Sequence, residues 1–268
     1  MAKDLITQNV PAISETMAAA VALFDKPGLV TGLEQVTQQD LSLPRLALLQ
    51  EGMSKQLKSR SAEYIATAKA GQFCDTSLGM VWDSIAVIPC YFARIFLEWG
   101  PEQGDGLQAN HGLDATVTRG LKLDDPKKPG AWRTPDGNLI VETPTYYVLN
   151  MTEPVFGRRG FIPLISSQVK RAKRWMDQIT IEKLERPDHT KFQAPLYWRA
   201  WVTEAVEESG KGHDWFGWKF APGPNILELD PTNKLLETAQ TFAREAKEGL
   251  IQLDTSKMDN EVTDGNAF

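Results

Sequence analysis

The sequence is poor in cysteine and contains no long apolar run. Its only two cysteines, Cys74 and Cys90, exclude a disulfide framework and a four-cysteine zinc site. No stretch of about 18 consecutive apolar residues is present, so no helix is expected to span a membrane. The first residues also lack the basic start and apolar run of a secretory signal. We therefore expect a protein of the reducing cytoplasm that does not enter a membrane.

The sequence also lacks the motifs of the common enzyme classes. It has no glycine-rich phosphate loop, dinucleotide fingerprint, zinc-protease H-E-x-x-H or G-x-S-x-G element. The histidines His111, His189 and His213 are widely separated and fall in or near expected turns. Asp125 and Lys127 have the acid-x-Lys spacing of some nucleases, but they lie in a proline-rich loop that would not hold a metal rigidly. We expect no enzyme, no cofactor and no metal site.

Charge is distributed unevenly along the chain, whose net charge is −6. Residues 204–268 contain 13 acidic and 6 basic residues, whereas residues 155–175 contain six basic residues and no acid. An acid-free basic segment is a candidate phosphate-binding surface, and a solvated helix face is the alternative. The candidate phosphate contacts are Arg158, Arg159, Lys170, Arg171, Lys173 and Arg174.

Hydrophobic patterns predict a β-rich middle and two helices. β-branched and aromatic runs indicate strands, and Pro89 indicates a bulge or an edge between two of them. Residues 100–137 are rich in glycine, proline and aspartate, which predicts a long loop. Residues 166–179 form the clearest helix, and Asp230-Pro231 is typical of the start of another, which Gly249 ends. The strands are expected at residues 84–91, 93–99, 139–151, 161–165, 195–206 and 213–220.

These patterns indicate an α+β fold with a mainly antiparallel β-barrel core, of the oligonucleotide-binding (OB) type, and peripheral helices. We expect a loosely ordered N-terminal arm over residues 1–40. A nucleic-acid-binding domain is expected over residues 41–250. Residues 251–268 are polar and acidic and are expected to form a disordered tail.

Aromatic residues gather in the expected hairpin at residues 195–220. Four of the eight tryptophans lie there, and strand alternation places Tyr197, Arg199 and Trp201 on one face. Aromatic rings stack on unpaired bases, and a guanidinium binds phosphate or stacks in turn. The alternative is that each indole packs in the core, as most strand aromatics do. The candidate stacking residues are Trp175, Tyr197, Trp201, Trp215 and Trp218, with Arg199 between them.

The C-terminal tail is a candidate docking segment for partner proteins. Asp259, Glu261 and Asp264 precede the terminal Phe268. In outline this resembles the acidic tip, ending in phenylalanine, of bacterial single-stranded-DNA-binding proteins. It lacks their run of consecutive aspartates and their Ile-Pro pair. The resemblance implies binding of replication or recombination proteins through the tail.

Several short segments carry a resemblance to known proteins: Leu43-Pro44-Arg45-Leu46 with Gln50, residues 71–73 and 85–89, residues 96–99, residues 135–149, residues 166–175 and residues 215–218. These segments resemble a family of small proteins that tailed bacteriophages encode near their replication genes. Some members of that family look like phage single-stranded-DNA-binding proteins, so the resemblance implies a role in phage DNA metabolism. It supplies no catalytic or metal-binding residue.

Together these observations predict a non-enzymatic protein that binds single-stranded DNA without sequence preference in phage replication or recombination. One alternative is a phage protein-interaction or virion-associated structural protein that does not bind nucleic acid. A second is a metal-dependent nuclease that uses loop carboxylates such as Asp125, and a third is a strand-annealing recombinase. An oligomer is possible, because the sequence leaves the oligomeric state open.

Overall fold

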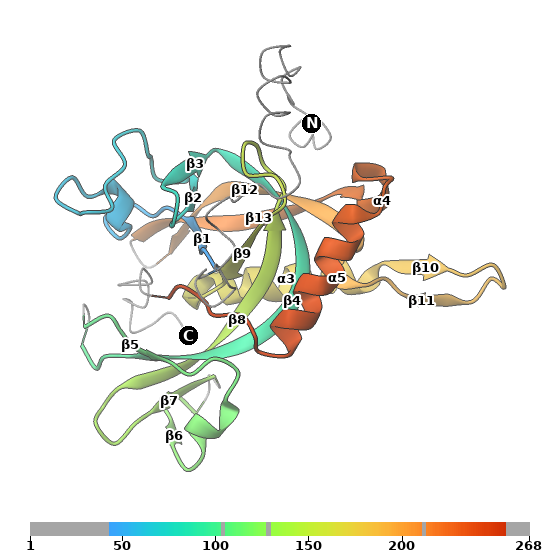
Figure 1. Cartoon of the computed structure of the whole chain (residues 1–268). Coiled ribbons are helices and arrows are strands. Elements are labelled where there is room, and N and C mark those ends of the chain that lie inside the picture. The colour runs from blue at the N-terminus through green and yellow to red at the C-terminus, as the bar shows by residue number, and fades with distance from the viewer. Residues whose placement is uncertain (1–42, 103–104, 127–129, 211–212, 256–268) are drawn as a thin grey trace, which may run out of the picture.

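Long antiparallel strands dominate the computed structural model, which describes residues 43–102, 105–126, 130–210 and 213–255 (Figure 1). The largest sheet has eight strands and curls into a half-barrel. Its strand order is β13-β12-β4-β8-β7-β6, with β5 paired to β4 and β9 paired to β8. The bounds are β4 Ser84–Trp99, β5 Leu107–Asn110, β6 Lys122–Leu123, β7 Ala131–Arg133, β8 Leu139–Asn150, β9 Arg158–Pro163, β12 Arg199–Gly210 and β13 His213–Asn225.

Two smaller sheets and three α-helices complete the described fold. The strands β1 Leu46–Leu48, β2 Phe73–Asp75 and β3 Met80–Trp82 form one sheet, and β10 Lys183–Glu185 and β11 Lys191–Gln193 form the other. The helices are α3 Val169–Ile181, α4 Ile226–Leu229 and α5 Lys234–Lys247. Short 3₁₀ turns lie at Lys55–Leu57, Ala115–Thr118, Ser166–Gln168 and Leu196–Trp198. The expected α+β class with a β-rich core is therefore confirmed.

The half-barrel is buried on both faces because apolar residues occupy successive positions along β4 and β8. In β4, Ile85 and Val87 pack on the side of α3, whereas Ala86 and Ile88 pack on the side of α5. Trp175 of α3 anchors the first core. Phe242 of α5 anchors the second core. A sheet covered on both faces leaves little room for exposed aromatics in its central strands.

Pro89 produces the bulge that the sequence indicates. The two expected strands at residues 84–91 and 93–99 form one continuous strand, β4, and its pairing with β8 shifts register between Pro89 and Tyr91. Proline has no N–H to donate to the sheet ladder, so a bulge at this position accommodates it. The bulge changes the register without ending the strand.

Two expected features of the secondary structure were wrong. Residues 100–137 do not form a long loop, because they contain β5, β6 and β7 and pair onto the end of the half-barrel. The last helix begins at Lys234 and its N-cap residue is Asn233, whereas the Asp230 carboxylate joins the preceding turn to the first turn of the helix. The carboxylate oxygens accept hydrogen bonds from the backbone N–H groups of Thr232 at 2.8 Å and Leu235 at 2.7 Å. The helix ends at Lys247, and the glycine expected to end it, Gly249, follows two residues later with a positive φ of 71°.

The expected terminal segments lie mostly outside the described residues. This applies to the arm at residues 1–40 and to Asp259, Glu261, Asp264 and Phe268 of the tail. The described start of the tail runs beside the body, where Leu253 pairs with Leu43 in a parallel bridge. Within the described ranges, no helix has the length and apolar character needed to cross a membrane.

Candidate nucleic-acid interface

Helix α3 separates apolar from basic residues around its axis. Ala172, Trp175 and Ile179 are buried against the half-barrel. Lys170, Lys173 and Arg174 are exposed on the opposite side, as their spacing of three and four residues requires. We call these three residues the α3 cationic face. The helix is therefore both part of the core and the carrier of an exposed basic surface.

The expectation that Trp175 stacks on bases is wrong, because its indole is fully buried. Its ring lies 3.8 Å from that of Phe220, with an angle of 5° between the planes, and 4.2 Å from that of Tyr146. Trp175 follows Ala172 by three residues and precedes Ile179 by four. Helical periodicity places it on the apolar face, and that signal could have been found in the sequence.

Trp201 and Trp218 are buried in the same core, so they are also wrong as base-stacking residues. Their exposed fractions are 3% and 4%. Trp201 meets Trp175 edge-on with ring centroids 6.1 Å apart, and Trp218 lies 4.8 Å from Phe73. Trp175, Trp201 and Trp218, which the sequence suggested as part of a DNA-binding surface, instead lie in the core between α3 and the half-barrel.

Strand alternation predicts that Tyr197 and Trp201 share one face, but in the structure they do not. Residues 196–198 form a 3₁₀ turn after Pro195, and the strand begins only at Arg199. This turn breaks the period of two. Tyr197 is half-buried against the core on the side of α5, whereas Trp201 lies in the core on the side of α3. The two rings therefore do not form one surface.

Arg158 and Arg159 are held by carboxylates from distant parts of the chain. The Arg158 Nε lies 3.1 Å from Oδ2 of Asp75, whose side chain is 1% exposed. The Arg159 Nη1 lies 2.7 Å from Oε2 of Glu245, and its guanidinium carbon lies 4.9 Å from the centre of the Phe242 ring. These pairs neutralise both charges and fix β9 to its neighbours. Both guanidiniums are therefore less suited to binding phosphate than the residues of the α3 cationic face.

Arg171 and Trp215 share one carboxylate near the end of the β12–β13 hairpin. Arg171 forms an ion pair with Glu208, and the Trp215 Nε1 donates a hydrogen bond of 3.0 Å to Oε2 of the same residue. The pKa of the Arg171 guanidinium is lowered mainly by burial and to a smaller extent by the positive charge of the neighbouring Arg174. Trp215 is half-buried, so it is the candidate aromatic that lies beside α3 with part of its surface exposed.

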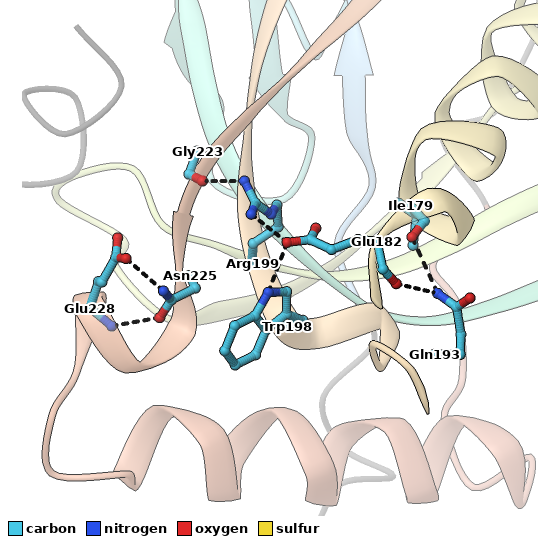
Figure 2. A network of polar contacts seen from close by, with 8 residues as sticks. All are labelled: Ile179, Glu182, Gln193, Trp198, Arg199, Gly223, Asn225 and Glu228. Atoms are coloured by element: carbon cyan, nitrogen blue, oxygen red, sulfur yellow. Dashed lines mark hydrogen bonds and ion pairs between the residues drawn. The ribbon is translucent and has the colours of Figure 1, made fainter. Parts of the chain in front are cut away.

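Arg199 belongs to a polar network at the end of α3 (Figure 2). Its guanidinium pairs with Glu182 and donates a hydrogen bond of 3.0 Å to the Gly223 carbonyl. The Trp198 Nε1 donates a hydrogen bond of 2.9 Å to the same Glu182 oxygen. Arg199 therefore joins α3 to the half-barrel, and its charge is already balanced.

The α3 cationic face differs from these paired arginines. Across the described ranges, Lys170, Lys173 and Arg174 have no carboxylate within ion-pair distance. The acid on their side of the helix is Asp177, one turn further along. Of the basic residues that the sequence suggested, these three have charges available for a ligand.

Sequence reasoning did not find the role of two glutamines that cover the outer edge of β13. The Gln50 amide accepts from the Phe216 N–H at 2.8 Å and donates to the Phe216 carbonyl at 2.9 Å. The Gln168 amide accepts from the Trp218 N–H at 3.1 Å and donates to the Phe216 carbonyl at 3.2 Å. These side chains satisfy an edge that would otherwise pair with another strand.

Two carboxylates of the segment at residues 100–137, Asp124 and Asp114, have partners of their own. Asp124 forms an ion pair with Arg133 at 2.5 Å, within the β6–β7 hairpin. Asp114 accepts hydrogen bonds from the backbone and hydroxyl of Thr116, and these bonds lower its pKa. In the part of the chain that the structure describes, no group of three or more His, Cys, Asp or Glu side chains could hold a metal ion.

Comparison with known proteins identifies the family. A family model described as "Pam3 phage gp34-like protein" matches residues 12–252, which is most of the chain. The chain belongs to the Pam3 phage gp34-like family. Searches of curated proteins and of solved structures found no match. Membership of the gp34-like family confirms the resemblance to phage proteins, and the family description names no biochemical activity.

Proposed function

We propose that the protein binds single-stranded DNA without sequence preference, in phage DNA replication or recombination. The α3 cationic face carries this proposal. Lys170, Lys173 and Arg174 are exposed within about 6 Å along the helix axis, and among the described residues no carboxylate lies within ion-pair distance of them. Closely spaced, unpaired cations attract the phosphates of a nucleic acid and release its counterions.

The burial of the indoles changes how such a protein would hold DNA. With Trp175, Trp201 and Trp218 in the core, affinity comes mainly from phosphate contacts. Trp215 is the candidate stacking ring beside these cations, because its carboxylate partner Glu208 also holds Arg171. A half-buried ring offers less stacking area than an exposed one. We therefore expect modest affinity that depends strongly on salt.

Two further parts of the proposal come from the sequence. The curl of the half-barrel supports an oligonucleotide-binding type of core. The acidic residues Asp259, Glu261 and Asp264, with Phe268, are proposed to bind replication or recombination proteins. An anionic tail would also compete with DNA for the α3 cationic face.

A salt titration of binding to labelled oligo-dT tests the proposal. With about three phosphate contacts, a plot of the logarithm of the association constant against the logarithm of the salt concentration should have a slope of about −2. A duplex of the same length should bind more weakly if Trp215 contributes stacking. Absence of binding at low salt, or binding that does not respond to salt, would contradict the proposal and favour a protein-interaction role.

A further inference from the structure

The ribbon formed by β10 and β11 projects from the body of the protein (Figure 1). We call residues 183–193 the arm. It follows directly from the end of α3, and among the described residues its two strands pair only with each other. An isolated two-stranded ribbon is marginally stable in water, so the arm is well suited to pairing with another strand.

The root of the arm is held firmly although its strands are not covered. The Glu182 carboxylate binds Trp198 and Arg199, as Figure 2 shows. The Gln193 Nε2 donates to the Glu182 carbonyl at 3.0 Å, and the Ala194 N–H donates to the same carbonyl at 3.2 Å. These bonds fix the direction in which the arm leaves the body. A fixed direction lowers the entropy cost of binding a partner.

The hydrogen bonds of the ribbon show which backbone groups of β10 point outward. Arg186 donates to the Thr190 carbonyl, and Ala194 donates to the Glu182 carbonyl, so residues 182 and 186 face β11. Because antiparallel pairing alternates, Lys183 and Glu185 direct their N–H and C=O groups away from β11. Among the residues that the structure describes, the outward-facing backbone donors and acceptors of Lys183 and Glu185 have no partner strand, so they form an open edge of β10.

We propose that this edge pairs with the same edge of a second copy of the chain. The sequence Lys183-Leu184-Glu185 is complementary to itself when two copies run antiparallel about Leu184. Each Lys183 then lies opposite Glu185 of the second copy, and both residues present outward-facing backbone groups, as a hydrogen-bonded pair requires. Lys183 and Glu185 are both exposed.

Two neighbouring features favour this pairing over a random strand partner. Alternating opposite charges deter most foreign strands but satisfy an identical antiparallel one. Ile181, just before β10, is 78% exposed and would lie near the turn of the second copy's arm. Glu185 also contacts His189 at 2.7 Å, yet half of its side chain stays exposed for a new partner.

The short edge implies weak association. A stable interface buries at least about 1,000 Å², more than three paired residues can supply, so pairing should depend on concentration. This inference does not rest on DNA binding, because none of its residues belongs to the α3 cationic face. The two proposals can therefore fail independently.

Sedimentation velocity of charge-reversed variants tests the pairing. The wild-type chain should associate reversibly at concentrations up to about 1 mM. K183E and E185K should each weaken association at least about tenfold, because each places like charges opposite one another in both pairs. The double variant K183E/E185K, or an equal mixture of the two single variants, should restore association. A wild-type chain that stays monomeric, association that survives either single reversal, or a mixture that fails to restore it would overturn the proposal.

A cysteine at the centre of the pairing gives a second readout. L184C should form an intermolecular disulfide, because the two copies of residue 184 face each other with Cα atoms about 4.5 Å apart. F192C, on β11, the other strand of the same ribbon, is the matched control and should cross-link far less. The native cysteines are buried and should not react. Equal cross-linking of the two variants would contradict pairing through β10.

Discussion

Reversing the charges of the α3 cationic face should abolish binding to oligo-dT without unfolding the protein. The variant K170E/K173E/R174E removes three phosphate contacts and adds repulsion. We therefore expect the affinity at low salt to fall by at least about 100-fold. The three side chains are exposed and lack ion-pair partners among the described residues, so the midpoint of urea unfolding should change little. Fluorescence anisotropy measures the affinity, and circular dichroism follows unfolding.

The matched control lies on the other side of the half-barrel. K234E/R244E/K247E reverses three exposed cations of α5 and changes the net charge of the protein by the same amount. If the α3 cationic face binds DNA, the α5 variant should retain affinity within a few-fold. Equal losses in the two variants would show that DNA responds only to overall charge, and that result would contradict a localised interface.

Replacing Trp175 with alanine should destabilise the fold, whereas the charge reversal on α3 should weaken DNA binding without unfolding the protein. Trp175 is fully buried and stacked on Phe220, so W175A should lower the free energy of unfolding by roughly 3–5 kcal/mol. This is a large part of the stability of a typical domain, about 5–15 kcal/mol. Urea unfolding monitored by far-UV circular dichroism measures the loss.

The milder variant W175F separates packing from DNA contact. Phenylalanine keeps an aromatic ring against Phe220 and removes an indole N–H that has no hydrogen-bond partner among the described residues. We expect it to cost about 1–2 kcal/mol and to leave oligo-dT affinity within about twofold of wild type. A stable W175F protein that loses DNA affinity would mean that Trp175 contacts bases, contrary to its position in the structure.

The long strands could be predicted from the sequence because their signals are local. Runs of β-branched and aromatic residues mark β4, β8 and the β12–β13 hairpin, and Pro89 marks the bulge. The face that each aromatic occupies was harder to predict. In a half-barrel with α3 on one face and α5 on the other, alternation does not select an exposed face, because both faces are buried. The indoles of Trp201 and Trp218 were misassigned for this reason.

The candidate site depends on tertiary contacts that a sequence does not show. Arg158 and Asp75 are 83 residues apart, and Arg159 and Glu245 are 86 residues apart. Nothing in the basic segment distinguishes these paired arginines from Lys170 and the other residues of the α3 cationic face. Only the fold shows which cations already have a carboxylate.

Lysine footprinting is the most direct test of where DNA binds. The full-length protein is acetylated with a lysine-specific reagent with and without oligo-dT, and modification at each position is measured by mass spectrometry. Lys170 and Lys173 should be protected when oligo-dT is bound, whereas Lys234 and Lys247 of α5 should react at the same rate in both samples. Protection of the α5 lysines with unchanged reactivity on α3 would contradict the account.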